Sequence, residues 1–429
     1  MTTFHLFLWL LGGLLLQVAL FLIIGFWRHW LNYLSLQGRL QESTNSSSPQ
    51  KSIVYAPSHL AAWKGMRTFR VERKVLEDTA EQVCSFYLSP KDGQLLPAFL
   101  PGQFLTFQLA IEGYSSADKP LIRCYSLSDS PNTEYFRISV KRIASPQPTS
   151  VAAGISSNYF HDHVKVGSEL QVLAPAGQFF INTGNSPVVL VGGGIGITPM
   201  LSMLNWVFEH QPQRETWLFY GVRNATELVF QEKLIELAKQ HPSFHLHLCM
   251  SDPHAIEPEA IKHTNVHLHH VRADIQLMRR VLPLKPFSFY ICGPSAMLQS
   301  LVPALEDWGV PSERIHFEAF GPASVTRSKK ITSAAIASEL GNPTETHEVK
   351  FSQSNQLAKW TPTKGSLLDF AEEQGIAVNS SCRSGVCGTC QTKLSKGKVN
   401  YTTEPVFEIE AGSCLLCIST PATDISLEI

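Results

Sequence analysis

Apolar residues recur with three different spacings along the chain, and the changes of spacing divide it into segments. Leu6–Trp27 reads LFLWLLGGLLLQVALFLIIGFW, a run without charge in which Gln17 is the one strongly polar side chain. From Arg67, short apolar runs alternate with polar positions between Pro and Gly turns, which predicts β-strands. After Pro187, apolar strands alternate with runs of helical spacing, which predicts a doubly wound parallel sheet.

The first apolar run is long enough to cross a lipid bilayer, because roughly 20 residues at 1.5 Å each span a hydrocarbon layer of ~30 Å. Trp27, Trp30 and Tyr33 sit where an aromatic belt would lie, and Arg28 follows the run whereas no Lys or Arg precedes it. The positive-inside rule then predicts a single-pass anchor with the rest of the chain in the cytoplasm. A cleaved signal peptide is the alternative, but signal peptides begin with basic residues and have shorter apolar runs.

The segment that follows Arg67 is expected to form an antiparallel β-barrel, because it contains several short strands at regular spacing. The strands expected there read FRVERKVL, EQVCSFYLS, FLTFQLAI, YFRISVKRI and ELQVLAPAGQFFI. The predicted segments are a membrane anchor (1–33), a Ser-rich linker (34–64), the barrel (65–183), an α/β domain (184–322), a second linker (323–344) and a small α+β domain (345–429).

Composition excludes several classes of protein. With 44% hydrophobic and 17% charged residues, the chain is not mainly disordered, a coiled coil or a collagen. The net charge of −1 gives no overall basic field, so bulk nucleic-acid binding is not expected. This near-neutrality is the sum of a basic first segment, +3 over residues 1–64, and an acidic last one, −3 over residues 345–429.

Four of the nine cysteines have the spacing of an iron–sulfur site rather than of a disulfide scaffold. Cys382-x4-Cys387-x2-Cys390 is followed, after 26 intervening residues, by Cys417. This is the plant-type C-x4-C-x2-C…C pattern, in which four thiolates hold a [2Fe–2S] cluster. Zinc normally uses C-x2–4-C pairs, which a triplet with one remote cysteine fits poorly.

The fourth ligand has a competitor, because Cys414 lies three residues before Cys417. The apolar strand context LLCISTP favours Cys417. Within the loop, Gly385 and Gly388 would let the backbone fold tightly and aim N–H groups at the sulfurs. These residues resemble the plant-type ferredoxin domain over about Val349–Ile429, which implies a β-grasp fold and a one-electron carrier. Typical potentials of such clusters are about −400 mV.

A second motif lies in the predicted barrel, where IRCYSLSDS contains Arg123-x-Tyr125-Ser126. It resembles the R-x-Y-S motif of the ferredoxin-NADP⁺ reductase superfamily. Because side chains alternate along a strand, Arg123 and Tyr125 point the same way and can line one groove. The resemblance implies that Arg123 binds the flavin phosphate and Tyr125 the isoalloxazine ring. It places Ser126 at flavin N5, through which hydride passes.

Two further stretches, ISVKR and GISSNYFHD, follow at the spacing of this superfamily. The second resembles the Gly/Ser-rich helix start that binds the flavin pyrophosphate, where free N–H groups and the helix dipole favour an anion. The resemblance implies that Gly154, Ser157 and Asn158 lie there and that Lys141 of ISVKR also binds the cofactor. YSLSDSPN, YFRISVKR and APAGQFF are similar to the reductase part of flavohaemoglobins, which favours FAD. Reductases of the phthalate dioxygenase type share the domain order but use FMN, so FMN stays open.

The nucleotide site is predicted at VVLVGGGIGITPM, where glycines after a buried strand let the backbone approach a pyrophosphate and a helix then begins. The stretch resembles the superfamily's G-x-G-x-T-P form, which implies that Gly194, Gly196, Thr198 and Pro199 bind the nucleotide. A glycine turn that merely joins a strand to a helix is the alternative.

Two later motifs resemble the end of the same domain. YICGP resembles the C-G-P motif, which implies a catalytic role for Cys292 near the nicotinamide and nucleotide contact at Gly293. A structural role for Cys292 is the alternative, because free cysteines are often buried. FEAFGP resembles the E-x-F-G-P end, which implies that Phe320 lies near the flavin and that Glu318 assists orientation or proton balance.

The choice of nicotinamide depends on the residues just after the strand Leu218–Val222. An acidic residue there would bind the ribose 2′-hydroxyl of NADH, and an arginine could hold the 2′-phosphate of NADPH. Arg223 is present and the next acidic residue is Glu227, which points to NADPH. Similar G-V-R endings occur in NADH-using members of the superfamily, so NADH is favoured and NADPH stays open.

Together these resemblances imply an NAD(P)H-dependent oxidoreductase that passes electrons through flavin and a [2Fe–2S] cluster to an external protein acceptor. Oxygenases, desaturases and hybrid-cluster proteins are the acceptor classes implied, and the anchor would hold the catalytic domains on the cytoplasmic side of a membrane beside one of them. A membrane-tethered redox sensor and a quinone reductase are the alternatives. The histidine-rich stretches HLHLC and HLHHV lack carboxylate or cysteine partners at ligand spacing, so surface or crevice histidines are expected there rather than a metal site.

Overall fold

The computed structural model describes the chain from Trp63 onward, apart from 64, 79, 116–119, 145–153, 253–262, 321–345, 377, 379, 381, 384, 406 and 408. All of these residues belong to one compact unit, Leu60–Ile429. The predicted anchor, almost all of the first linker and the predicted linker 323–344 lie outside the described residues. Across the ranges that are described, no helix has the length and apolar character needed to span a bilayer.

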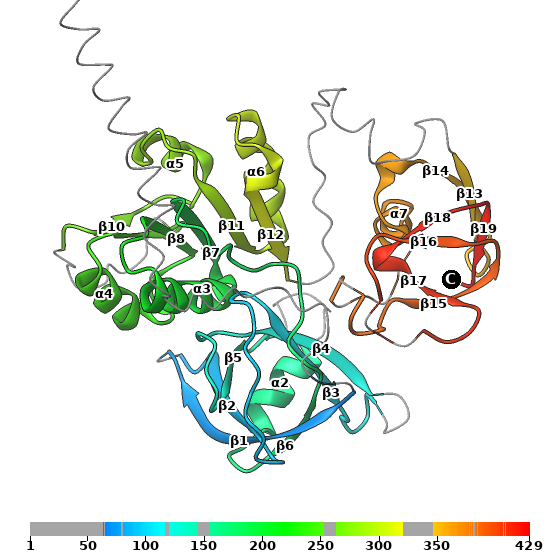
Figure 1. Cartoon of the computed structure of the whole chain (residues 1–429), viewed down its shortest axis with the longest axis horizontal. Coiled ribbons are helices and arrows are strands. Elements are labelled where there is room, and N and C mark those ends of the chain that lie inside the picture. The colour runs from blue at the N-terminus through cyan, green and yellow to red at the C-terminus, as the bar shows by residue number, and fades with distance from the viewer. Residues whose placement is uncertain are drawn as a thin grey trace, which may run out of the picture. The chain divides into compact units, whose positions relative to one another are not determined.

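The first domain is the predicted antiparallel barrel, with strands in the order β4-β3-β6-β1-β2-β5 (Figure 1). Its strands are β1 (Arg67–Leu76), β2 (Val83–Pro90), β3 (Phe104–Leu109), β4 (Leu121–Ser126), β5 (Phe136–Lys141) and β6 (Glu169–Val172). An antiparallel bridge between Leu127 and Ile138 joins the two edge strands. The helix α2 (Ile155–Asp162) packs onto this barrel through Phe160, which is fully buried.

The prediction of one long strand over ELQVLAPAGQFFI is wrong, because β6 ends at Val172. Pro175 follows closely and has no N–H to donate to a ladder. Beyond it, Ala176 pairs with Phe104 only as an isolated bridge. The chain leaves the barrel at this point toward the second domain.

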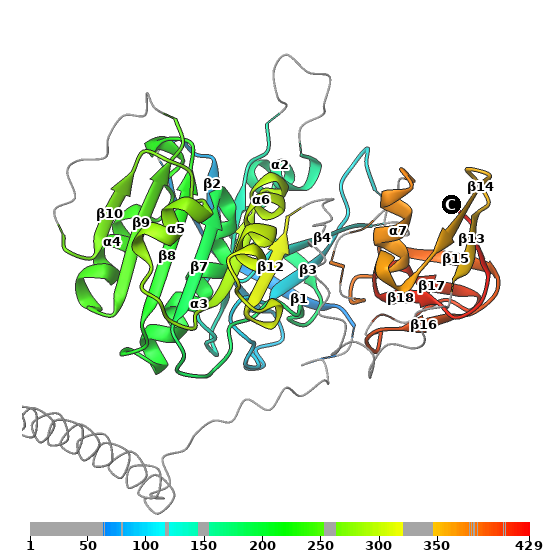
Figure 2. The ribbon, with the colours of Figure 1, turned by 90° about the horizontal axis from the view of Figure 1, so that it is seen from above.

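The second domain is a parallel sheet in the order β10-β9-β8-β7-β11-β12, whose strands lie side by side in Figure 2. The strands are β7 (Val188–Gly193), β8 (Thr216–Val222), β9 (Phe244–Met250), β10 (Val266–His269), β11 (Ser288–Gly293) and β12 (Ile315–Ala319). Apolar residues of α3 (Ile197–His210) and α4 (Gln231–Gln240) cover one face, and those of α5 (Ile275–Val281) and α6 (Ser295–Asp307) cover the other. The strand order reverses between β7 and β11, and ligands of such sheets bind outside the carboxyl ends of the strands at this reversal.

Helical spacing of apolar residues extends over ELVFQEKLIELAKQH, residues 227–241, but α4 begins only at Gln231. Phe230 precedes it with a left-handed φ of 60°. Leu228, Val229 and Phe230 are buried instead in the same core as α3. Burial of apolar side chains before the helix therefore moved its start.

The third domain has the α+β arrangement expected of a β-grasp fold. A mixed sheet in the order β14-β13-β19-β15-β17 packs with α7 (Leu367–Glu373), and β13 and β19 are its parallel pair. The strands are β13 (His347–Phe351), β14 (Gln356–Trp360), β15 (Gln391–Lys396), β17 (Ser413–Leu415) and β19 (Ile425–Leu427), with a separate pair, β16 (Val399–Tyr401) and β18 (Ser419–Pro421). A capping box between Ser366 and Asp369 begins α7.

Polar contacts connect the loop after β4 to α3. Asn205 donates to the Asp129 carboxylate at 2.5 Å, and Ser202 donates to the Asp129 carbonyl at 2.7 Å. Ser130 donates to Glu209 at 2.7 Å. Buried polar groups paired in this way fix the end of β4 against the start of the nucleotide domain.

Candidate functional site

The β4 strand carries the R-x-Y-S motif on a half-buried surface. Tyr125 packs edge-on against Phe107 and Phe160, and its hydroxyl lies 2.9 Å from Ser156 Oγ in the first turn of α2. Arg123 donates to the carbonyl of Ile122 at 2.7 Å. These contacts place Tyr125 against α2. Because side chains alternate along a strand, Arg123 lies on the same side of β4 as Tyr125, which is the arrangement predicted for residues that line one groove.

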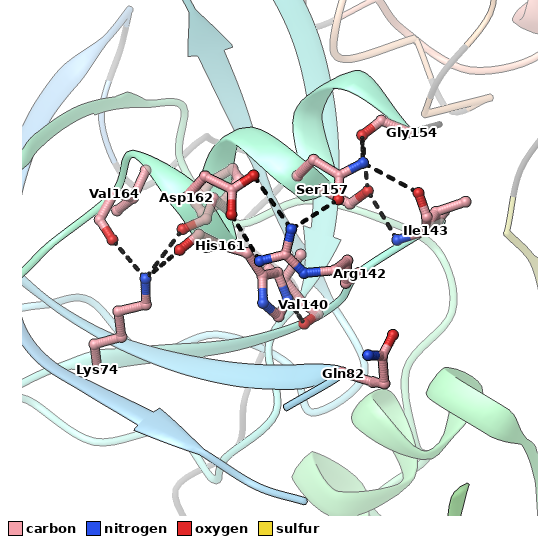
Figure 3. Close-up of polar contacts among 12 residues, drawn as sticks. Lys74, Gln82, Val140, Arg142, Ile143, Gly154, Ser157, His161, Asp162 and Val164 are labelled. Carbon is pink, nitrogen blue, oxygen red and sulfur yellow. Dashed lines mark hydrogen bonds and ion pairs between the residues drawn. The ribbon is translucent and has the colours of Figure 1, made fainter. Parts of the chain in front are cut away.

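Gly154 precedes α2, and no side chain caps the first turn of the helix (Figure 3). Ser157 and Asn158 donate instead to the Gly154 carbonyl, at 3.1 and 2.9 Å. Asn158 also donates to Ile143 at 3.1 Å. The first-turn N–H groups are therefore available to an anion, while both side chains hold the helix start against the end of β5. That arrangement fits a pyrophosphate bound by backbone N–H groups.

The far end of α2 is neutralised by a basic side chain. Lys74 donates to the carbonyls of His161 and Val164 at 2.6 and 2.9 Å (Figure 3). Arg142 joins Asp162 at 2.7 Å, and this ion pair lowers the pKa of the carboxyl. Cations at a helix C-terminus stabilise the dipole that favours an anion at its other end.

Lys141, predicted to bind the flavin, ends β5 and lies 3.8 Å from Glu227. Glu227 in turn binds Arg223 through Nε at 2.8 Å and through Nη2. These three charges sit where the barrel meets the carboxyl end of β8. The pairing of Arg223 with Glu227 is a feature that residue order alone did not predict.

The glycine turn after β7 is a short 3-10 helix (Gly194–Gly196) that leads directly into α3. Gly194 has a left-handed φ of 53°, and a Cβ on Gly196 would lie 2.1 Å from the Cys292 carbonyl oxygen. Thr198 and Pro199 are buried in the first turn, and Thr198 donates to the Ile195 carbonyl at 3.0 Å. The turn is therefore closed tightly against β11, which leaves its outer side for a ligand.

Cys292 and Gly293 end β11 at the same edge of the sheet. Cys292 has no exposed surface, and burial raises the pKa of its thiol well above the usual value. Glu318 lies opposite Cys292 on β12, and burial raises the pKa of its carboxyl to about 8. The charge of Cys382 adds to this rise, and Ser126 opposes it. Phe320 follows β12 and packs against the core under α3.

Two buried polar atoms at this edge, Ser126 Oγ and Glu318 Oε2, make no hydrogen bond of ordinary geometry within the described part of the chain, although the two side chains lie close enough to interact. They come from different domains, the barrel and the parallel sheet. Buried polar groups are normally paired. A buried hydroxyl from the barrel and a buried carboxyl from the parallel sheet, each short of a well-formed hydrogen bond, fit a polar cofactor ring held between them.

The four predicted cluster ligands converge. The backbone N–H of Cys387 donates to Cys382 Sγ at 3.3 Å, and the reverse contact is 3.5 Å. The side chain of Cys417 meets those of Cys382 and Cys390. Gly385 and Gly388 have left-handed φ values of 74° and 71°, as the tight loop requires.

Cys417 fits the fourth-ligand position better than Cys414 does. Cys414 has no exposed surface, contacts Ser419 and pairs with Thr392 in the sheet. The predicted strand context of Cys417 is wrong, because Cys417 lies in a 3-10 turn, Leu416–Ile418. In that turn Cys417 is only partly buried and packs at the margin of the core, whereas Cys414 lies inside it.

Sequence reasoning missed Cys124, the second residue of the R-x-Y-S motif. Its side chain contacts that of Cys387 and lies 3.3 Å from Thr106 Oγ1. Strand alternation could have signalled it, because Cys124 must face away from Arg123 and Tyr125. A contact with a loop more than 250 residues away could not be read from spacing.

The histidine-rich strands form a stack of rings. His247 Nδ1 lies 2.8 Å from His269 Nε2, and the His247 ring packs on Phe219 and His267 at 4.7 and 4.8 Å. The histidines of this stack are not placed to hold one metal ion. His247 is 2% exposed, so it belongs to the packed interior, whereas the sequence led us to expect surface or crevice histidines here.

Comparison with known proteins identifies two of the domains. Residues 190–302 match the family model of the oxidoreductase NAD-binding domain, and residues 354–422 match that of the 2Fe-2S iron-sulfur cluster binding domain. A flavohemoprotein of Bacillus cereus is 38% identical over 263 residues, 61% of this chain and 62% of that protein. The chain thus spans less than two thirds of this curated relative.

Two solved structures are also similar. The flavohem-like FAD/NAD-binding domain of nitric oxide dioxygenase from Vibrio cholerae is 34% identical, with a TM-score of 0.51 over 60% of this chain and 100% of that one. Phthalate dioxygenase reductase is 23% identical, with a TM-score of 0.47 over 85% of this chain and 98% of that one. The family matches confirm the predicted order of a nicotinamide-nucleotide domain followed by a 2Fe–2S domain.

Proposed function

Because the chain is an oxidoreductase with a ferredoxin reductase-type FAD/NAD-binding part and a C-terminal 2Fe–2S domain, we propose that it transfers electrons from NADH through FAD and the cluster to a protein acceptor. One observation carries the proposal. The cluster loop closes on itself, since the backbone N–H groups of Cys382 and Cys387 each donate to the sulfur of the other, at 3.5 and 3.3 Å. A loop that gathers thiolates in this way, in a chain that also has the nicotinamide-nucleotide domain, is what electron transfer from NADH to a cluster requires.

FAD is the flavin that the chain is proposed to hold, through Arg123, Tyr125, Ser126 and the first turn of α2. The similar domain from Vibrio cholerae, described as FAD/NAD-binding, is matched over its whole length, which supports FAD over FMN. Bound flavin takes up a hydride as an electron pair and can release the electrons singly, and the cluster at Cys382, Cys387, Cys390 and Cys417 carries one electron.

The chain's own residues orient the nicotinamide and exclude water. The glycine turn and Gly293 allow the nucleotide backbone to approach the sheet closely. Cys292 and the carboxyl of Glu318 are buried at the carboxyl ends of β11 and β12. Both groups hold their protons at neutral pH, because burial raises the pKa of each. An uncharged edge of this kind does not attract water into the hydride site.

The pairing of Arg223 supports NADH as the donor. Its Nε and Nη2 are both occupied by Glu227, so they are not available to a 2′-phosphate. A carboxylate beyond this strand is the group that suits a ribose 2′-hydroxyl. We expect kcat/KM to favour NADH, and Glu227→Gln to shift the preference toward NADPH. An unchanged ratio in Glu227→Gln would remove Glu227 from the specificity site.

Membrane attachment belongs to the proposal as well. Leu6–Trp27 would anchor the chain as a single span, with the catalytic domains in the cytoplasm beside an acceptor such as an oxygenase, a desaturase or a hybrid-cluster protein. The acidic third domain suits a basic docking face. Carbonate-washed membranes should retain the full chain and lose most of a Leu15→Arg variant, since a central arginine costs roughly 2.5–3.5 kcal/mol on insertion. Release of the unaltered chain would contradict the anchor.

The electron order is tested with the purified full chain and NADH under anaerobic conditions. We expect the flavin absorbance to bleach and cytochrome c to be reduced. Cys387→Ser should abolish cytochrome c reduction and leave flavin bleaching intact, whereas Cys84→Ala, which alters a buried thiol in the barrel, should change neither. Cytochrome c reduction that survives in Cys387→Ser would overturn the proposed order.

A redox-sensing module and a quinone reductase are the competing functions. A sensor has no need of a hydride path, so the absence of flavin bleaching with either nicotinamide would favour it. Quinone reduction that persists in Cys387→Ser would place the exit of electrons at the flavin. The burial of Cys292 opposite Glu318, whose carboxyl interacts with Ser126, is the observation that favours a hydride path.

A further inference from the structure

We propose that Lys74 is a positioning residue for the flavin, whose ammonium holds the far end of α2 and thereby strengthens the binding of the flavin pyrophosphate at the near end. The inference rests on the proposed function, because it presupposes FAD bound at the first turn of α2. It assigns a role to a residue of β1 that belongs to none of the flavin motifs and precedes His161 of α2 by 87 residues.

The Lys74 ammonium binds three carbonyls where α2 ends (Figure 3). It donates to the carbonyls of His161 and Val164 at 2.6 and 2.9 Å, and that of Phe160 lies at 3.5 Å. The last carbonyls of a helix have no partner inside the helix and form the negative end of its dipole. A single cation from another strand therefore lies directly on that end.

The surroundings of Lys74 keep its ammonium in this place. The side chain is half-buried, and Nζ lies 5.4 Å from the centre of the Phe86 ring of β2. Phe86 packs edge-on against Phe160 of α2, with 5.3 Å between ring centres, and both rings are fully buried. A cation over an aromatic ring is attracted to it, and a partly buried charge is screened less than one in open solvent. The field of the ammonium therefore acts along the helix.

Other groups at this end of α2 leave the charge of Lys74 uncancelled. Asp162 would oppose it, but Asp162 pairs with Arg142 at 2.7 Å. The buried ring of His161 has Nε2 2.9 Å from the Val140 carbonyl, and burial lowers the pKa of this imidazole, so it is neutral at pH 7. Lys74 itself binds carbonyls rather than a carboxylate, and its full charge faces the helix end.

The helix is short enough for its two ends to influence one another. It has eight residues and is therefore roughly 12 Å long. A cation at the carboxyl end stabilises the same dipole whose positive end would hold the negatively charged pyrophosphate. Loss of the charge should weaken FAD binding by about tenfold. Riboflavin has the same ring system without phosphate, so its binding should not depend on this charge.

The test measures the dissociation constants of FAD and riboflavin for the full chain freed of flavin, by quenching of flavin fluorescence. Lys74→Met removes the charge at similar length, and Lys74→Arg keeps it. Lys91→Met is the matched control, because Lys91 is a lysine of the same barrel that is 51% exposed and pairs with Glu169 at 2.8 Å.

In Lys74→Met we expect an FAD dissociation constant about tenfold higher and a riboflavin constant within about twofold of the unaltered value. Lys74→Arg should stay within about threefold for FAD, and Lys91→Met should bind both flavins as the unaltered chain does. If Lys74→Met does not fold, Lys74→Gln, which keeps a donor without the charge, takes its place in the same comparison.

Equal FAD dissociation constants in Lys74→Met and Lys91→Met would overturn the inference. A loss shared equally by riboflavin, or an equal loss in Lys74→Arg, would also overturn it, because Lys74 would then only shape the barrel. Failure of the proposed function looks different, because the unaltered chain would then bind no FAD or its flavin would not bleach with NADH.

Discussion

Cys292 and Glu318 are direct partners in the parallel ladder between β11 and β12. The thiol has no exposed surface, and the carboxyl Oε2 is buried without a hydrogen-bond partner within the described part of the chain. Burial raises the pKa of both groups, that of Glu318 to about 8. At neutral pH, the edge of the sheet where hydride would pass is therefore protonated and uncharged.

Glutamine at position 318 should copy the protonated carboxyl. At pH 7, Glu318→Gln is expected to be reduced by NADH within about threefold of the unaltered rate. Because a carboxyl of pKa about 8 is mostly ionised above that pH, the unaltered protein should slow by roughly tenfold between about pH 7 and about pH 9 and the variant should not. Stopped-flow flavin bleaching from about pH 6 to 10 measures both. Parallel pH profiles would show that Glu318 does not titrate in this range.

Gly196→Ala should destabilise the nucleotide domain. The added Cβ would lie 2.1 Å from the Cys292 carbonyl oxygen, and backbone on that side cannot move without shifting β11. We expect a loss of about 2–4 kcal/mol in the free energy of unfolding and a raised KM for NADH. Gly184→Ala is the control, because a Cβ there meets nothing closer than 3.7 Å. Similar urea midpoints for the two variants would argue against the tight turn.

The fourth cluster ligand can be separated from its neighbour. Cys417→Ser should lose most of the visible absorbance of the cluster, because its side chain meets Cys382 and Cys390. Cys414→Ser should keep that absorbance and lose about 1–2 kcal/mol of stability, since it places a hydroxyl in an apolar core. Absorbance and iron content per chain measure the first effect, and urea unfolding measures the second. Loss of the cluster in Cys414→Ser alone would reverse the assignment.

His247 should make the protein sensitive to acid. Burial, followed by the charges of His267 and His269, lowers the pKa of His247 to about 3. The unfolded imidazole takes up its proton near pH 6.5, so unfolding is favoured as the pH falls from about 6.5 toward 3, by up to about 1.4 kcal/mol per pH unit.

His247→Leu should reduce the pH dependence of the free energy of unfolding by the equivalent of about one bound proton. Urea unfolding at about pH 7.5 and about pH 5 measures this dependence. His163→Leu is the control, because His163 is exposed on the barrel and lies far from the histidine stack in the chain. Equal slopes in the unaltered protein and His247→Leu would contradict the buried neutral state of His247.

Much of the fold could be predicted from periodicity. Alternating patterns placed the barrel strands, and the change after Pro187 placed the parallel sheet, because burial on one face or on two imposes different spacings. Boundaries were less predictable. Pro175 ended β6 early, and burial of Phe230 delayed α4. A proline or a buried side chain can end an element that the apolar periodicity would continue, and the periodicity alone does not show this.

The candidate site divides in the same way. Spacing predicted the four cluster cysteines, because one loop must supply three thiolates at fixed separations. Spacing did not predict that Ser157 and Asn158 turn back to the Gly154 carbonyl, leaving the first-turn N–H groups of α2 for an anion. Nor did spacing predict that the guanidinium of Arg223 donates to the carboxylate of Glu227.

The order of residues by itself determined the domain order, the cofactor motifs and the apolar run at Leu6–Trp27, because these depend on chemistry within short stretches of chain. Only the tertiary structure decided which distant groups meet. Cys382 and Cys387 close one loop, Cys292 pairs with Glu318, and Cys414 is fully buried in a core against which Cys417 packs only partly buried. Such pairings depend on strand register and packing, which many residues set together and no single motif records.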